Sequence, residues 1–115
     1  MNKVNCFAIF LILCLFYSNS AFGEAGDRLE VDGYKFHIST NLRGNILQVR
    51  GSVNGGKKCN KLTVDIFLHN ETGNICHVIP ILDNYKGSDK FSVSDKVYGS
   101  SRSRWSVSNV YIKCY

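Results

Sequence analysis

Long apolar runs, proline and helical periodicity are scarce in this chain of 115 residues, and each scarcity excludes a class of protein. No apolar run reaches the roughly 20 residues that a membrane-spanning helix requires. A single proline and the absence of repeats exclude collagen-like and proline-rich chains. The hydrophobic fraction of 44% and the charged fraction of 20% indicate one small globular domain.

The N-terminal segment has the pattern of a secretory signal. Lys3 precedes the uncharged apolar run Cys6–Tyr17, and a polar stretch then leads to Ala21-Phe22-Gly23, a small-x-small cleavage pattern. We expect cleavage after Gly23, which makes residues 1–23 a signal peptide and residues 24–115 a single mature domain without a transmembrane span. An uncleaved N-terminal anchor is the alternative. Export predicts a secreted or periplasmic location, where disulfides persist.

Apolar residues alternate with polar ones along the remaining chain, which predicts β-strands. In the best example, Leu62, Val64, Ile66 and Leu68 are expected in the core, with Asp65 and His69 on the surface. Similar runs are found at 34–38, 47–53, 91–93 and 105–114. Residues 75–82 are instead apolar on both faces, and Pro80 places them at a sheet edge or a bulge. Six or seven strands separated by turn residues predict an all-β antiparallel sandwich or barrel.

One succession of segments resembles a known family. Residues 49–56 form a strand end, residues 62–68 an alternating strand, residues 71–74 a hairpin and residues 91–93 a later strand. This order is similar to FxLYD-type immunoglobulin-like domains of bacterial extracytoplasmic proteins. The name-giving motif differs, because residues 66–70 read Ile-Phe-Leu-His-Asn. The resemblance covers about half of the mature chain and implies a small antiparallel immunoglobulin-like sandwich with no catalytic residues.

Three cysteines remain after residue 23, so at most one bridge forms within the chain, and the sequence alone allows three pairings. The segments 62–68 and 105–114 resemble strands C and F of immunoglobulin-like sandwiches. In those sandwiches, C and F are antiparallel neighbours. The resemblance therefore implies a disulfide between Cys59 and Cys114 and a free thiol at Cys76. Three reduced thiols, or a bridge from Cys76 to another chain, are the alternatives.

The ionisable residues do not form a known catalytic or metal-binding motif. His37, His69 and His77 are scattered, and both C-x-x-C and G-x-S-x-G are absent. Asp65 and His69 share one strand face but lie about 13 Å apart at ~3.3 Å per residue, too far for a hydrogen bond. We expect isolated histidines, no metal site and no cofactor.

Asn70-Glu71-Thr72 is an N-glycosylation sequon within the expected hairpin, where the asparagine should be exposed. Glycosylation requires a eukaryotic secretory pathway, and the bacterial resemblance makes the sequon incidental.

Basic and aromatic residues gather in and beside the loops, where a sandwich often binds its partners. The predicted binding rim consists of Lys57, Lys58, Lys61, Tyr98, Arg102, Arg104 and Trp105. Its charge favours acidic partners, although solvated loop charges that maintain solubility are the alternative. The net charge of +5 is modest and no nucleic-acid-binding motif is present, so nucleic acid is not an expected partner.

These patterns predict a secreted or periplasmic binding module without catalytic activity, whose partner is a protein or an acidic envelope ligand. One alternative is a small secreted inhibitor or immunity-type protein that blocks an enzyme through a protruding loop, with residues 98–104 as the candidate. Another is a small secreted toxin or hydrolase, which requires a histidine beside a serine or an aspartate in a pocket.

Overall fold

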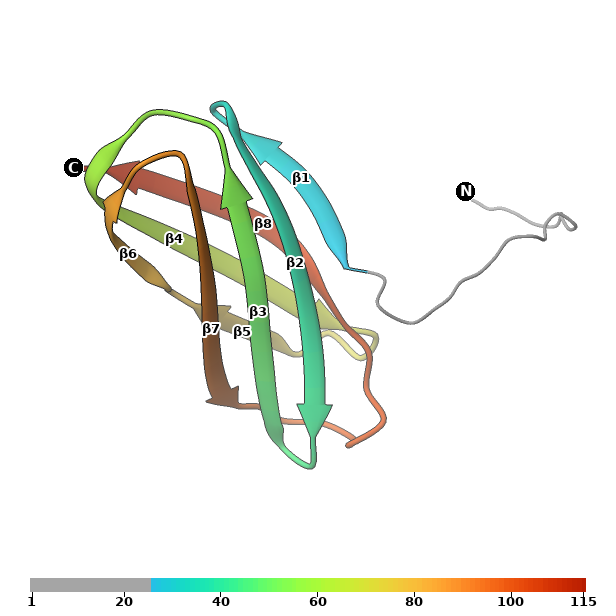
Figure 1. Cartoon of the computed structure of the whole chain (residues 1–115). Helices are drawn as coiled ribbons and strands as arrows, with labels where there is room; N and C mark the ends of the chain where they lie inside the picture. Colours follow the sequence, from blue (N-terminus) through green and yellow to red (C-terminus); the bar gives the residue numbers. More distant parts are fainter. Residues whose placement is uncertain (1–25) are drawn as a thin grey trace, which may run out of the picture.

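The computed structural model describes residues 26–115, which form two antiparallel sheets packed face to face (Figure 1). Sheet A contains, in spatial order, β1 (Asp27–Val31), β2 (Tyr34–Arg43), β3 (Ile46–Asn54) and β7 (Ser88–Lys96). Sheet B contains β4 (Cys59–Asn70), β5 (Ile75–Val78), β6 (Ile81–Tyr85) and β8 (Trp105–Cys114). The predicted all-β antiparallel sandwich is confirmed. The predicted signal peptide lies outside the described residues, and residues 26–115 include no helix that could span a membrane.

Part of the strand order matches that of an immunoglobulin-like sandwich. β2, β3 and β7 are neighbours in the order of strands A, B and E, and β4 pairs with β8 as strand C pairs with F. β5 and β6 follow one another along the opposite edge of β4, separated by Pro80. The Pro80 carbonyl still accepts the N–H of Val64 at 3.0 Å. The two segments thus act as one interrupted edge strand, as the proline predicted.

β1 is the strand that the sequence patterns missed. Asp32 and Gly33 have φ angles of 49° and 87° and form the two-residue turn into β2. An Asp-Gly pair is a strong hairpin signal because its residues tolerate positive φ. Leu29 and Val31 pack partly against the core, but five residues are too few for their alternation to stand out.

The core lies between the sheets and is built from alternate residues of each strand. Leu62, Val64, Ile66 and Leu68 of β4 are each 0% exposed, while Asp65 and His69 lie on the outer surface. This facing was predicted and is confirmed.

A β-bulge changes the facing of β8 partway along its length. Phe67 pairs with Asn109, but Leu68 pairs with Val107, so Ser108 is an extra residue in the ladder. Trp105 faces the core before the bulge, and Val110 faces it after the bulge. The bulge explains why core-facing and outward-facing residues do not follow one regular alternation throughout residues 105–114.

Cys59 and Cys114 form a disulfide with a Cα–Cα distance of 5.4 Å. The bridge joins the start of β4 to the end of β8, because these strands are antiparallel neighbours. The predicted pairing is confirmed, and Cys76 is a free, buried thiol.

The Cys76 thiol is expected to react slowly in the folded protein. Burial, with a smaller effect of Asp95, raises its pKa, and the thiolate is the reactive form. We expect labelling by an aromatic disulfide reagent at pH 8 to be at least about tenfold slower in native protein than in urea. Equal rates in the two states would contradict the buried position.

Candidate functional site

The predicted rim residues lie at opposite ends of the sandwich. Lys57 and Lys58 belong to the β3–β4 loop near the C-terminus, with Lys61 close by in β4 (Figure 1). Tyr98, Arg102 and Arg104 belong to the β7–β8 loop at the other end. The prediction of one rim is therefore wrong, because β3 and β7 are antiparallel and the loops that follow them leave from opposite ends.

Trp105 is not a surface residue of the predicted rim. It is 7% exposed and belongs to the core, and its indole N–H has no hydrogen-bond partner among the described residues. The large aromatic side chain faces inward at the start of β8. With Arg102 and Arg104 it lines a depression between the β7–β8 loop and the end of β2.

Asn70 corrects a second expectation, because its side chain is buried at 3% exposure. Its Oδ1 accepts the backbone N–H groups of Thr72 at 3.1 Å and Asn74 at 2.8 Å. Its Nδ2, the atom that glycosylation would modify, donates to Asn74 Oδ1 at 3.0 Å. In the folded domain Asn70 therefore organises the hairpin and is not an exposed glycan acceptor.

Both ends of the sandwich have loops fixed by specific contacts. In the β3–β4 loop, the Tyr34 hydroxyl donates to the Lys57 carbonyl at 2.6 Å, and Tyr85 donates to the Gly55 carbonyl at 2.5 Å. Burial raises the pKa of both tyrosines, so both remain protonated donors at neutral pH. In the β7–β8 loop, the Arg104 N–H donates to Glu71 Oε1 at 3.0 Å. The segment predicted as a protruding inhibitory loop is thus joined to the β4–β5 hairpin.

The outer surface of sheet A carries a concentration of positive charge that the loop-based prediction missed. Alternate residues of its strands project away from the core, and among them six are cationic and one is acidic: Arg28, Lys35, Arg43, Arg50, Lys90, Lys96 and Glu30. This surface is therefore strongly basic.

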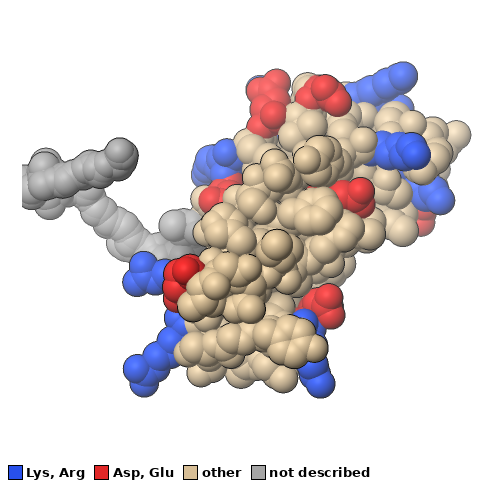
Figure 2. All heavy atoms as spheres, turned by 180° about the vertical axis from the view of Figure 1, so that it is seen from behind, with Lys and Arg blue, Asp and Glu red and all other residues tan. Residues whose placement is uncertain are grey.

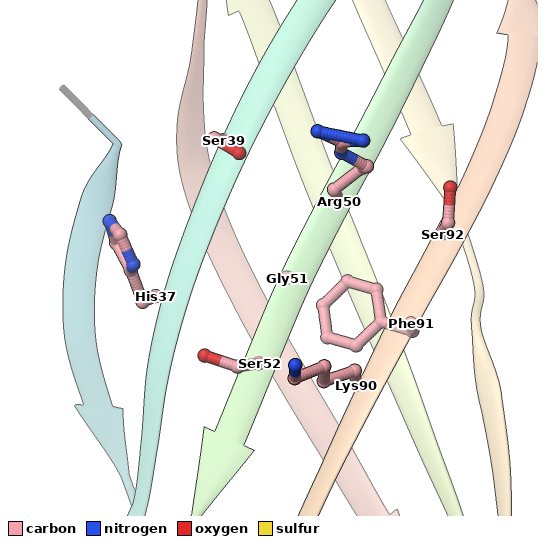
Figure 3. A pocket seen from close by; sticks show the side chains of 8 residues that line it. All are labelled: His37, Ser39, Arg50, Gly51, Ser52, Lys90, Phe91 and Ser92. Atoms are coloured by element: carbon pink, nitrogen blue, oxygen red, sulfur yellow. The ribbon is translucent and has the colours of Figure 1, made fainter. Parts of the chain in front are cut away.

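An open depression lies at the centre of this surface (Figure 3). Strand register places its polar side chains in two rows across β2, β3 and β7. In one row Arg50 lies between Ser39 and Ser92, and in the other Ser52 lies between His37 and Lys90. Neighbouring strands are about 4.8 Å apart and alternate residues about 7 Å apart, so cations and hydroxyls alternate at short spacing. Among residues 26–115, no carboxylate lines this depression.

The floor of the depression depends on a glycine. Gly51 lies between the two rows, directly opposite Phe91 of β7. A Cβ at position 51 would collide with the Phe91 ring, approaching Cε1 to 2.8 Å. The missing side chain lets the ring lie across β3, where Phe91 belongs to the core and also lines the depression.

The histidines are less isolated than predicted. His37 is paired across the strands with Ser52 in the depression, although no hydrogen bond joins them among the described contacts. On sheet B, His77 Nε2 lies 3.9 Å from Asp65 Oδ1, and the His77 ring stacks on Phe67 with centroids 4.0 Å apart. Strand register explains these placements, because His37 lies opposite Ser52 and His77 lies opposite Phe67.

No protein-family model, curated protein or solved structure matches the chain. The resemblance to FxLYD-type domains stays a prediction.

Proposed function

We propose that the protein is a secreted or periplasmic binding module whose sheet A surface binds an acidic ligand bearing carboxylate, sulfate or phosphate groups. The observation that carries this proposal is the double row of cations and hydroxyls, to which the described part of the chain adds no carboxylate. Arg50 and Lys90 supply charge and N–H donors, and the three serines supply hydroxyl donors. Hydrogen bonds in which one partner is charged are about twice as strong as neutral ones, which suits this donor set to oxyanions.

The shape of the surface favours an extended ligand. A second depression adjoins the first and shares His37 and Ser52 with it. It continues toward β1, where the cations Arg28 and Lys35 and the carboxylate of Glu30 are among its lining residues. Donors on adjacent strands of a paired sheet keep a fixed spacing, so a repeating acidic polymer could engage several of them together.

Binding is favoured over catalysis by what surrounds His37. A general base activates a nucleophile through a hydrogen bond and is itself oriented by a third group. Among the described contacts, no such bond joins His37 to a serine, and Glu30, the carboxylate that lines the second depression together with His37, makes no hydrogen bond or ion pair with it. The Cys59–Cys114 disulfide supports the exported location, because such bonds persist in oxidising compartments.

The proposal predicts that the protein binds immobilised dextran sulfate and does not bind neutral dextran. The double variant Arg50→Gln/Lys90→Gln should weaken binding about 5- to 30-fold, since two exposed charge contacts contribute roughly 1–2 kcal/mol together. The control Arg102→Gln/Arg104→Gln removes the same charge from the β7–β8 loop and should retain most of the affinity. Binding should also weaken as salt rises, because the contacts are solvent-exposed.

Equal losses in the two double variants would show that net charge alone drives binding and would contradict the site. A hydrolase function, suggested by the His37–Ser52 pair, would appear in the same assay as shortening of the polymer. Ser52→Ala should abolish that shortening if Ser52 is a nucleophile, whereas a binding site should lose little affinity.

A further inference from the structure

The outer surface of sheet B is apolar where that of sheet A is basic. Of the seven exposed large hydrophobic side chains in the described chain, five belong to this surface: Ile75, Ile79, Ile81, Tyr111 and Tyr115. Their exposed fractions range from 48% to 73%. Figure 2 shows this side of the molecule, where uncharged side chains cover the middle and most charged ones lie toward the periphery. Large apolar side chains that gather in this way on one exposed face are typical of an interaction surface.

An ordered aromatic cluster occupies the centre of this surface. The ring of Phe67 stacks on His77 with an interplanar angle of 7° and meets the edge of Tyr111 at a centroid distance of 5.9 Å. These three residues come from neighbouring strands β5, β4 and β8. Mutual packing limits their rotation, so contact with a partner would immobilise few additional side chains.

The charges on this surface indicate what could cover it. The outward-facing residues of its strands include two cations, Lys61 and Lys113, and two acids, Asp65 and Asp83. Lys61 lies directly opposite Asp83 on β6. The surface is thus electrically balanced on a chain whose net charge is +5. Two copies could meet here without the like-charge repulsion that two sheet A surfaces would experience.

We propose that the protein self-associates through the outer surface of sheet B, forming a two-fold symmetric dimer. Along β4, Ile75 lies opposite His69 and Ile81 lies opposite Thr63. These two isoleucines therefore lie on either side of the aromatic cluster. A two-fold axis near Phe67 would place Ile75 of one copy against Ile81 of the second. A symmetric interface of this kind requires a self-complementary patch, which these residues provide.

The size of the surface predicts a reversible dimer. The twelve residues of β4 span about 40 Å, and three strand positions cover about 14 Å in width. The footprint is on the order of 600 Å² per copy, somewhat below the roughly 800 Å² of a standard stable interface. A footprint of this size favours a dimer that dissociates reversibly over an obligate one, and this inference does not depend on the proposed ligand.

Sedimentation equilibrium of the exported, disulfide-bonded protein tests this proposal. We expect a monomer–dimer equilibrium that salt does not weaken, because apolar contacts carry it. Ile81→Lys should raise the dissociation constant about tenfold or more. Ile46→Lys is the matched control: it converts another exposed isoleucine, at the end of sheet A, and should leave the equilibrium unchanged. Thermal unfolding should show that both variants remain folded.

A wild-type protein that stays monomeric at millimolar concentration would overturn the proposal, as would equal weakening by the two variants. A dimer abolished by reductant would instead be linked through Cys76. A dimer that dissociates as salt rises would indicate a charge-driven interface elsewhere. Both of these results would also contradict sheet B as the interface.

Discussion

Loss of the Cys59–Cys114 disulfide is expected to lower the free energy of unfolding by about 4 kcal/mol. The bridge closes a loop with a sequence separation of 55, which removes conformational entropy from the unfolded chain. In the folded protein it also holds the end of β8 beside the start of β4, where a C-terminal strand would otherwise fray. Small domains have about 5–15 kcal/mol of total stability, so this bridge supplies a large share.

Urea unfolding with and without a reductant measures this contribution. The midpoint of the wild-type protein should fall in reductant, and the double variant Cys59→Ser/Cys114→Ser should unfold at a similarly low midpoint with or without it. Cys76→Ala serves as the control, because it removes the free thiol and should remain sensitive to reductant. A wild-type midpoint that does not respond to complete reduction would contradict a stabilising role for the bridge.

Local sequence patterns predicted the features of the fold that depend on a single strand or turn. The alternation at 62–68 placed Leu62 and Leu68 in the core, because side chains point to opposite faces with a period of two residues. The resemblance to strands C and F located the disulfide. β1 was missed because its signal lies mainly in the Asp32-Gly33 turn rather than in its short apolar pattern.

The candidate site could not be predicted in the same way, because it depends on register between strands far apart in sequence. His37, Ser52 and Lys90 each face outward in a local pattern, but only the pairing of β2, β3 and β7 puts them in one row. The rim prediction failed for the same reason: a sequence locates loops without showing the end of the sandwich to which each belongs. Trp105 shows that residue type alone does not distinguish a binding aromatic from a core one.

The two proposals together give the sandwich two functional surfaces on opposite sides. A dimer formed through sheet B would leave both sheet A surfaces exposed and facing away from each other. An acidic polymer long enough to reach both would then bind with an avidity above the affinity of one domain, since the second contact becomes intramolecular. The Ile81→Lys variant should accordingly weaken binding to dense dextran sulfate while the site on each copy stays intact.

The packing that supports both surfaces predicts a sharp contrast between neighbouring residues of β4. Ile66 is 0% exposed and lies in the middle of the strand, paired with Val78 on one side and Val110 on the other. Ile66→Ala should lower the free energy of unfolding by about 2–5 kcal/mol, because it removes buried methyl groups and leaves a cavity. Asp65→Ala should change it by less than about 1 kcal/mol, since this side chain is 42% exposed and its contact with the His77 ring, at 3.9 Å, is long.

Both variants introduce an alanine, at adjacent positions of one strand, so the β-propensity of the new residue is the same in both. The difference in unfolding free energy therefore depends on which of the two side chains faces the core. A shift of β4 by one residue would reverse the effects, because it would bring Asp65 into the core and Ile66 to the surface. Urea unfolding of both variants under oxidising conditions, with the disulfide intact, measures the contrast. Comparable losses of stability for Ile66→Ala and Asp65→Ala would show that Ile66 does not face the core while Asp65 faces outward. The residues assigned to the apolar outer surface of sheet B would then also be wrong.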